Sequence, residues 1–245
     1  MISIVTVCYN SEKTLARTIE SVLKQNVDEL EYILVDGDST DSTLDIIRQY
    51  EEKFIKKGWK YFYISEKDAG MYDAMNKGIR IATGNVIGIL NSDDWYEENA
   101  LSIVTRKAES VNADIYMGAI NVINGSNTFI KKANNRAYKT SRDFNHPAMF
   151  VTALCYEQVG NYEIDNVHDD YGWYLKALKQ GKIVSIIDDV LTNYPTGGIG
   201  SKKSIRNTLE RIGTKYRVYK NNGYSKLYFW ECVAQEIGKY ILLKG

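Results

Sequence analysis

The first hundred residues alternate short, uniformly apolar runs with longer stretches in which apolar residues recur three or four positions apart. The runs are too short for helices, and their uniform apolarity predicts strands buried on both faces of a sheet. They cover residues 2–7, 32–35, 61–64 and 86–90. In the stretches between them apolar residues recur at helical spacing, as Leu15, Ile19 and Val22 do in the first stretch. Strands and helices that alternate over short connections are typical of right-handed βαβ units. We therefore expect an α/β fold with a mostly parallel central sheet flanked by helices.

The pattern changes after residue 100. Asn124-Gly125 is a strong hairpin signal between two apolar runs, which predicts a small antiparallel hairpin. The short strands expected here are residues 114–123, 128–130, 183–187 and 190–192. Residues 201–245 predict two amphipathic helices whose apolar stripes would be core or subunit contacts. These stripes are Ile205, Leu209, Ile212, Tyr216 and Tyr219 in the first helix and Leu227, Trp230, Ala234, Ile237 and Ile241 in the second.

Polar residues follow three of the predicted parallel strands. Tyr9 and Asn10 come after the first, and Ser11 is expected to cap a helix over residues 12–25. Asp36-Gly37-Asp38 comes after the second strand. Because ligands bind at the carboxyl ends of strands in open α/β sheets, we expect one cleft there. Tyr9 offers a face for stacking, and the acids can accept hydrogen bonds from a nucleobase or a ribose. The alternative for residues 36–41 is a turn followed by a helix cap.

Asn91-Ser92-Asp93-Asp94 directly follows the fourth predicted strand. Two adjacent carboxylates repel each other unless a cation or a proton lies between them. With a nearby amide oxygen, they suit Mg²⁺ or Mn²⁺, which prefer oxygen ligands and often share their shell with phosphate. The alternative is structural: Asp94 could cap a helix that begins near Tyr96.

A second acidic pair, Asp169-Asp170, precedes the helix-spaced residues Leu175 and Leu178. The two acids therefore lie in or near the first turn of a predicted helix. The alternative to a chemical role is again structural, because the helix dipole favours acids at this position. The two histidines, His146 and His168, have no partner at a catalytic spacing, so structural roles are the first expectation for both.

Bulk composition narrows the class of protein. The 245 residues are 44% hydrophobic and their formal net charge is zero, so no global basic field points to nucleic acid. Three scattered cysteines predict free thiols in a reducing compartment. With no basic segment before the first apolar run and no apolar run of about 18–20 residues, we expect neither a secretory signal nor a membrane span, and a cytoplasmic protein. The basic, aromatic-rich tail over 201–245 would also suit the inner face of a membrane.

Four motifs in order carry a resemblance to a known family. They are Thr6-Val7-Cys8-Tyr9-Asn10, Val35-Asp36-Gly37-Asp38-Ser39-Thr40-Asp41, the run from Glu66-Lys67-Asp68-Ala69-Gly70 to Asn76-Lys77-Gly78, and Asn91-Ser92-Asp93-Asp94. The chain resembles the family 2 glycosyltransferases of the GT-A fold, especially bacterial members that build surface polysaccharides. The resemblance implies a GT-A catalytic domain over 1–200, with a nucleotide-sugar-binding half to residue 100 and an acceptor half after it.

The resemblance also implies roles for individual residues in an inverting transfer from a nucleotide-sugar donor, with UDP as the expected carrier. Tyr9 falls at the base-stacking position and Asp36 at the base-bonding one, while Asp38 departs from the more usual residue. Asp68 and Asn76 belong to the third motif and are expected to bind substrate. Asn91-Ser92-Asp93 aligns with the Asp-x-Asp motif, which implies Asp93 as the ligand of Mn²⁺ or Mg²⁺ and Asn91 beside the donor.

On the acceptor side, Asp170 takes the position of the catalytic base, with Asp169 as the alternative, and His146 lies in an acceptor-lining segment. The acceptor implied is a saccharide or a lipid-linked saccharide, and a homodimer is a further expectation. Many relatives carry Arg where this chain has Met75. Phosphate neutralisation would then depend on the metal, on Lys77 or Arg80, or on the basic tail.

Two rival functions remain. A sugar nucleotidyltransferase would need a glycine-rich basic loop after the first strand to hold a triphosphate, and the turn Cys8-Tyr9-Asn10-Ser11 has no glycine. A non-catalytic nucleotide-binding or membrane-docked assembly protein would have lost turnover, which the retained Asp93 and Asp170 argue against.

Overall fold

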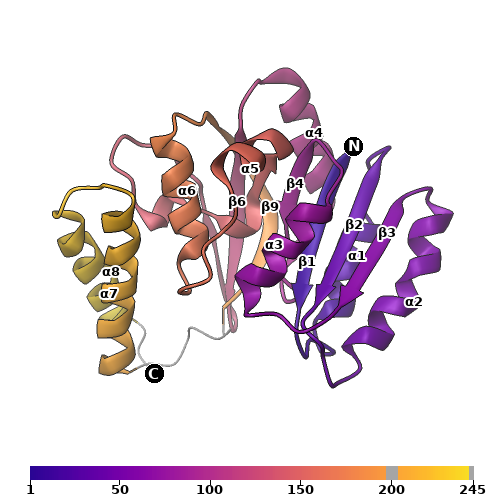
Figure 1. Ribbon diagram of the computed structural model, residues 1–245, viewed down its shortest axis with the longest axis horizontal. Helices are drawn as coiled ribbons and strands as arrows, with labels where there is room; N and C mark the ends of the chain where they lie inside the picture. The colour runs from indigo at the N-terminus through magenta and orange to yellow at the C-terminus, as the bar shows by residue number, and fades with distance from the viewer. Residues whose placement is uncertain (197–203, 243–245) are drawn as a thin grey trace.

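A nine-stranded mixed sheet with helices on both faces forms the body of the computed structural model (Figure 1), which describes residues 1–196 and 204–242. Residues 197–203 and 243–245, which belong to the expected tail and its junction, lie outside the described residues. The strands are β1 (Ile2–Cys8), β2 (Leu30–Asp36), β3 (Lys60–Ser65), β4 (Val86–Ile89), β5 (Trp95–Tyr96), β6 (Ile115–Asn124), β7 (Asn127–Lys131), β8 (Met149–Thr152) and β9 (Val184–Pro195). Their order is β3-β2-β1-β4-β8-β6-β9-β5, and β7 pairs with β6.

The strands β1 to β4 are parallel, which confirms the predicted α/β class. β8 is antiparallel to both of its neighbours, and β6 and β7 form the predicted hairpin. The α-helices are α1 (Leu15–Leu23), α2 (Thr43–Lys56), α3 (Met71–Ile81), α4 (Ala100–Ser110), α5 (Ala153–Val159), α6 (Asp169–Lys179), α7 (Ile205–Asn221) and α8 (Tyr228–Leu242), and the 3-10 turns are η1 (Ser141–Asp143) and η2 (His146–Ala148).

Two cores cover the two faces of the sheet. Every residue of β1 and β2 is buried, so their side chains alternate between the cores. Val5 and Val7 pack into the core that contains α3 and α6, whereas Ile4 packs into the core that contains α1, α2 and α4. Polar residues inside the sheet are paired: Ser3 Oγ donates to Glu31 Oε2 at 2.6 Å. The exposed ends of the strands are therefore where unpaired polar groups can gather.

Two boundaries differ from the sequence prediction. Helix α1 begins at Leu15 rather than near residue 12, and Ser11 does not cap it: the Ser11 hydroxyl contacts Ser92 Oγ at 2.8 Å, and Thr14 is the N-cap residue. The two short strands expected at 183–187 and 190–192 are one strand, β9, because register shifts beside Met117 and Ala119 absorb the irregularity that separates the two apolar runs.

The tail forms an antiparallel pair of helices, α7 and α8, at the side of the domain next to α6 (Figure 1). The expected apolar stripe of α8 is not its buried face. Leu227, Trp230, Ile237 and Ile241 are all exposed, and the helix buries Tyr228, Cys232 and Glu236 instead. In α7, Ile212 and Tyr219 are buried as expected, but Ile205 and Leu209 are exposed. Within residues 1–196 and 204–242, no helix has the length and apolarity to cross a bilayer.

Gly88 shows how closely β4 and β8 pack. A Cβ atom at Gly88 would lie 2.6 Å from Cε1 of Phe150, a residue with no exposed surface. We expect Gly88→Ala to lower the free energy of unfolding by about 1–3 kcal/mol, because the ring has no space to move into. Gly213→Ala is the control, since nothing lies within 4 Å of its Cβ position in α7. It should raise stability by about 0.5–1 kcal/mol. Urea unfolding measures both, and a Gly88→Ala protein as stable as wild type would contradict this packing.

Candidate active site

Three loops meet at the carboxyl ends of β1, β2 and β4. The Asn10 N–H donates to Ser39 Oγ at 2.8 Å, and the Thr40 N–H donates to Asn10 Oδ1 at 2.9 Å. Ser11 Oγ and Ser92 Oγ, 2.8 Å apart, join the first loop to the loop after β4. The residues that follow three separate strands thus form one connected rim.

Tyr9, Gly37 and Asp68 come together on this rim. The Tyr9 ring is 62% exposed. A Cβ atom at Gly37 would lie 2.6 Å from Asp68 Oδ2 and 3.4 Å from Cδ2 of Tyr9. A side chain at position 37 would therefore displace the Asp68 carboxylate and touch the Tyr9 ring, so glycine keeps the gap between an open aromatic face and a carboxylate.

The two acids after β2 have different environments. Asp36 is fully buried; its carboxylate accepts from Ser39 Oγ at 2.5 Å and from Ser65 Oγ at 2.6 Å. Asp38 is exposed and adopts a positive φ of 66°, while Asn10 on the neighbouring loop has a φ of 50°. Left-handed backbone at residues other than glycine is strained and clusters at functional sites. Asp36 thus holds the loop in place, whereas Asp38 is exposed to solvent.

The loop after β4 carries an acidic pair with unpaired oxygens. Asp94 is fully buried, and burial followed by the charge of Asp93 holds its pKa well above the usual range. Burial also raises the pKa of Asp93, although Arg17 acts in the opposite direction. Asn91 Nδ2 donates to Asp94 Oδ2 at 3.3 Å, but Asp94 Oδ1 and Asn91 Oδ1 are buried with no partner.

Asp94 is not a helix cap, the alternative that the sequence left open. Trp95–Tyr96 is the short strand β5, paired with Asn193 and Thr192 of β9, and α4 begins later with Asn99 as its N-cap. Asn91 Nδ2 donates to one oxygen of this buried acid, and the other oxygen, Oδ1, has no donor. A cation bound here would offset the repulsion between Asp93 and Asp94 and would give the unpaired Asp94 oxygen a partner.

These residues fit a divalent cation that arrives together with a ligand. No group of three or more His, Cys, Asp or Glu side chains placed to hold a metal occurs in the described part of the chain. Mg²⁺, however, is often held by one or two carboxylates plus the phosphates of a substrate. Asp93, with the unpaired oxygens of Asp94 and Asn91, supplies that partial set of oxygen ligands.

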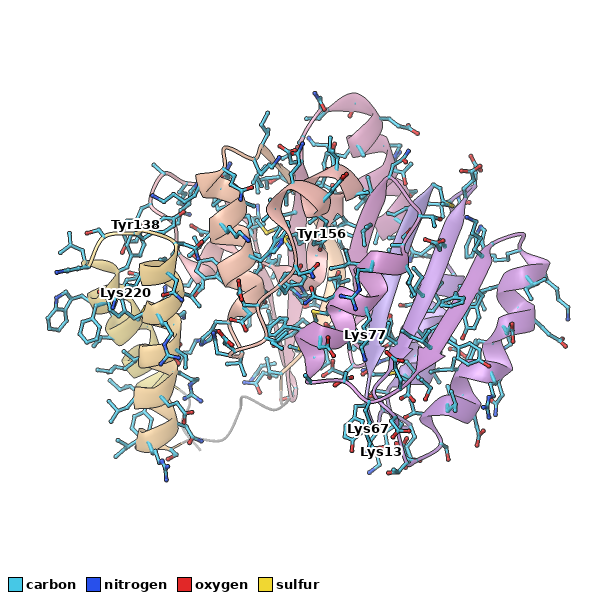
Figure 2. All side chains as sticks on the ribbon, viewed as in Figure 1. Lys13, Lys67, Lys77, Tyr138, Tyr156 and Lys220 are labelled. Atoms are coloured by element: carbon cyan, nitrogen blue, oxygen red, sulfur yellow. The ribbon has the colours of Figure 1, made fainter. Side chains whose placement is uncertain are left out.

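Arg17 is a cationic candidate that the sequence pattern did not reveal. Its guanidinium donates to the Asp93 carbonyl at 2.9 Å and lies 3.7 Å from the centroid of the Trp95 ring. Lys77, an expected phosphate partner, is instead paired with Glu66 at 2.9 Å. Figure 2 shows Lys13 and Lys67 near the carboxyl ends of β1 to β3. Cations near the rim thus come from α1 and from loops, not from the position that Met75 occupies.

The structure separates the roles of Asp169 and Asp170. Asp169 is buried, and its carboxylate accepts from the N–H groups of Asp165 and Asn166 at 2.7 and 2.8 Å. Asp170 is partly exposed and accepts from Tyr72 OH at 3.1 Å. Asp169 therefore anchors the loop before α6, whereas Asp170 keeps one carboxylate oxygen available. Tyr72, from α3, was not identified from the sequence because 98 residues separate it from Asp170.

Asn76 and His146 lie deeper than expected for substrate-binding residues. The Asn76 amide donates to the Tyr162 carbonyl and accepts from the Tyr162 N–H, both at 2.9 Å. It therefore holds the segment that leads to α6. His146 in η2 is buried and its Nε2 has no partner. Burial lowers its pKa, and the opposing effect of Asp170 places it near the second acidic pair.

Tyr194, near the end of β9, connects the two acidic regions. Burial raises its pKa, and so do the charges of Asp94, Asp93 and Asp170. Its side chain is 37% exposed. One partly exposed tyrosine therefore lies within electrostatic reach of both acidic pairs. The sequence placed this residue in no motif. The pairing of β9 with β5, the strand that directly follows Asp94, and with β6 brings it to the site.

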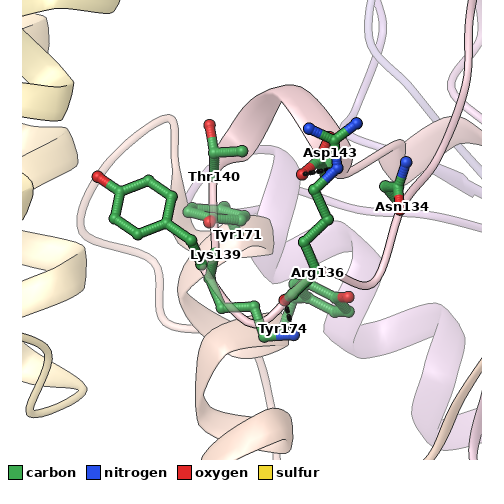
Figure 3. A pocket seen from close by; sticks show the side chains of 8 residues that line it. Asn134, Arg136, Lys139, Thr140, Asp143, Tyr171 and Tyr174 are labelled. Atoms are coloured by element: carbon green, nitrogen blue, oxygen red, sulfur yellow. Dashed lines mark hydrogen bonds and ion pairs between the residues drawn. The ribbon is translucent and has the colours of Figure 1, made fainter.

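A separate hollow lies between α6 and the segment before η1 (Figure 3). Its charged side chains bind one another or the neighbouring backbone: Arg136 Nε is 3.8 Å from Asp143 Oδ2, and Lys139 Nζ donates to the Arg136 carbonyl at 2.5 Å. Its charges are therefore satisfied internally, and it does not include the acidic residues of the rim.

A mostly parallel sheet, a rim of loops at the strand ends and two separated acidic pairs define the class of GT-A glycosyltransferases. Over residues 3–169 the chain matches the model described as Glycosyl transferase family 2. The chain belongs to that family.

Relatives come from several organisms. An uncharacterised glycosyltransferase of Nostoc sp. is 30% identical over 58% of this chain and 43% of its own length. A PGL/p-HBAD biosynthesis glycosyltransferase of Mycobacterium bovis is 29% identical over 89% of this chain and 86% of its own length. Chondroitin synthase of Escherichia coli is 27% identical over 97% of this chain, which corresponds to 37% of that protein. This chain thus spans about half or less of the length of several curated relatives.

Solved structures share the fold. A crystal structure of S. aureus TarS 1–349 in complex with UDP has a TM-score of 0.71 at 17% identity, covering 98% of this chain and 71% of that one. The mannosyltransferase PcManGT from Pyrobaculum calidifontis, in complex with GDP-Man and Mn²⁺, has a TM-score of 0.67 at 17% identity, covering 100% of this chain and 76% of that one. At this identity the likeness establishes the fold.

The imidazole of His168, just before α6, gives a testable pH dependence. Burial, followed by the charge of Lys215, lowers the pKa of His168 to about 4. As pH falls below the ordinary value near 6.5, the unfolded chain takes up this proton before the folded one, so stability is lost down to about pH 4. We expect His168 to contribute a loss of about 2 kcal/mol between pH 7 and pH 5.

Urea unfolding of wild type and His168→Gln at both pH values isolates this contribution, because the other titrating groups are common to both proteins. The free energy of unfolding should fall less steeply in His168→Gln. Equal slopes in the two proteins would show that His168 is not held neutral by its surroundings.

Proposed function

We propose that the protein is an inverting glycosyltransferase that moves a sugar from a UDP-linked donor to a saccharide or lipid-linked saccharide acceptor. The observation that carries the proposal is the presence of two separate acidic regions, Asp93-Asp94 after β4 and Asp170 at the start of α6, whose charges both act on Tyr194. Inversion requires a base on the face of the sugar opposite the leaving group. The nucleotide-bound relatives TarS and PcManGT support a nucleotide-sugar donor.

The donor occupies the rim over residues 1–100. The exposed Tyr9 ring stacks on the base, while Asp38 and Asp68 accept hydrogen bonds from its polar edge or from the ribose. Arg17 neutralises part of the diphosphate charge. Asp93, with Asn91 beside it, holds Mn²⁺ or Mg²⁺, which when bound stabilises the charge that develops on the departing nucleoside diphosphate.

Asp170 acts as the general base. It accepts the proton of the acceptor hydroxyl as that oxygen bonds to the anomeric carbon, and the bond from that carbon to the diphosphate oxygen breaks. Tyr72 OH, 3.1 Å from Asp170 Oδ1, keeps the carboxylate in one orientation with its second oxygen free for the acceptor. Asp169 positions this residue through the backbone of the preceding loop.

The donor nucleotide and the metal site can be tested together by calorimetric titration. UDP, GDP, CDP and dTDP, each with and without Mn²⁺, would be added to wild type, Asp93→Asn and Asp188→Asn. We expect UDP to bind in a metal-dependent manner, at least tenfold more weakly to Asp93→Asn, because that variant loses a carboxylate that we assign to the metal. Asp188, exposed on β9, is the matched control and should bind like wild type. Failure of every nucleotide to bind would refute the proposed donor class.

The roles of the second acidic pair can be separated by kinetics and stability. We expect Asp170→Asn to lower kcat by about 10²–10⁴-fold with unchanged nucleotide binding, since it removes proton transfer alone. Asp169→Asn should chiefly lower stability, because it weakens the anchor of the loop. The measurement is release of the nucleoside diphosphate from the matching nucleotide-sugar, with a saccharide panel as acceptors. Intact nucleotide binding without turnover in wild type would favour the non-catalytic alternative.

A further inference from the structure

Helices α7 and α8 present a row of large apolar side chains to solvent. Helices of water-soluble domains usually turn such a stripe inward, and large exposed apolar patches mark interaction sites. Leu227 is 72% exposed and Trp230 67% exposed. The outer face, as we name it, consists of Ile205, Leu209, Leu227, Phe229, Trp230, Ile237 and Ile241.

A buried carboxylate explains why these residues point outward. Glu236 has no exposed surface and accepts from Arg211 Nε at 3.0 Å, Lys239 Nζ at 3.1 Å and Lys215 Nζ at 3.2 Å. Although burial opposes it, the charges of Lys239 and Lys215 lower the pKa of Glu236 to about 2. Because removing one partner of a buried ion pair is strongly destabilising, this contact fixes the rotation of α8. Ile237, the next residue, is thereby directed to the surface.

An aromatic contact links the two helices beside the outer face. The rings of Tyr216 in α7 and Phe229 in α8 have centroids 5.4 Å apart, and Phe229 contacts Trp230 at 5.3 Å. Through Tyr216, which is partly buried beside the outer face, the aromatic part of this face on α8 contacts α7.

Positive charge surrounds the outer face. Within residues 204–242, Glu210 is the one exposed acid, whereas five cationic side chains are exposed. These are Arg206, Arg217, Lys220, Lys226 and Lys239, of which Lys239 also pairs with the buried Glu236. The chain as a whole has a net charge of zero, so this excess is local.

We propose that the outer face binds the surface of an anionic lipid membrane. Amphipathic helices with basic flanks and Trp or Leu on the apolar face lie in the membrane interface, where apolar burial and attraction to anionic headgroups add. A second copy of the chain fits less well, because a two-fold contact between two outer faces would place like charges opposite each other.

Membrane binding by the outer face would also bring a lipid-linked acceptor close to Asp170, an inference that rests on the proposed function. The start of α7 and the end of α8 lie on the side of the domain to which β1 to β3 point (Figure 1). Helix α7 is joined to α6, which carries Asp170, by Tyr171 OH and Tyr219 OH at 3.0 Å. A membrane-bound outer face would thus hold the base near the bilayer surface, where a lipid-linked saccharide presents its sugar.

Vesicle flotation without nucleotide tests the docking itself. The probes are vesicles of phosphatidylcholine alone and of phosphatidylcholine and phosphatidylglycerol in equal parts. We expect wild type to bind the vesicles that contain phosphatidylglycerol but not those of phosphatidylcholine alone, and to dissociate from them at high salt. Lys220→Gln with Lys226→Gln should weaken binding about 25-fold, about fivefold for each cation removed. Leu227→Ser with Trp230→Ser should weaken it at least tenfold, and both changes are on exposed positions that the fold tolerates.

Matched controls lie on other helices. Leu154→Ser on α5, 57% exposed, and Lys24→Gln with Lys56→Gln near α1 and α2 should bind like wild type. Absence of binding to anionic vesicles, or equal losses in the controls, would overturn the proposal. So would a dimer in sedimentation that Leu227→Ser with Trp230→Ser dissolves. Nucleotide titration of the same proteins keeps the two proposals apart, because the rim can bind nucleotide whether or not the outer face binds lipid.

Discussion

Complete burial of the parallel strands is the constraint on which the rest of the molecule depends. β1 and β2 have no exposed residue, so each polar side chain within them needs an internal partner, as Ser3 has in Glu31. Chemistry that needs free carboxylates or an open aromatic face can develop only where the strands end. The rim of Tyr9, Asp38 and Asp93 follows from that restriction, and hydrogen bonds between the loops turn three strand ends into one surface.

The two acidic pairs show how burial divides apparently equivalent residues. In each pair one carboxylate is buried, Asp94 or Asp169, and its neighbour is more accessible. The buried members differ in turn, because Asp169 accepts three hydrogen bonds from its own loop whereas Asp94 keeps an oxygen with no donor. The hydrogen bonds of Asp169 therefore account for its burial. Asp94 has a buried oxygen without a donor, which is why we assign the cation to the loop after β4 rather than to the start of α6.

Electrostatics also govern the helical pair at the side of the domain. Glu236 collects three cations between α7 and α8, and this buried cluster takes the place that an apolar seam would ordinarily have. Large apolar side chains are left outside as a result. Burial and then the charges of Lys215 and Lys239 lower the pKa of His168 and of Lys131, which links the helical pair electrostatically to the start of α6 and to β7.

Local patterns in the sequence determined the α/β class, the parallel strands, the hairpin at Asn124-Gly125 and the set of acids at strand ends, because alternation and spacing report directly on burial. They could not show that the Asp36 carboxylate accepts hydrogen bonds from Ser39 and Ser65. Nor could they show that Asn76 binds the Tyr162 backbone. The presence of Tyr72, Arg17 and Tyr194 at the site was also not predictable from these patterns. These contacts link residues far apart in the chain. The tail makes the same point: helical spacing identified the apolar stripe of α8, but the buried Glu236 decided which way it faces, since the ion pairs with α7 exist only once both helices are packed.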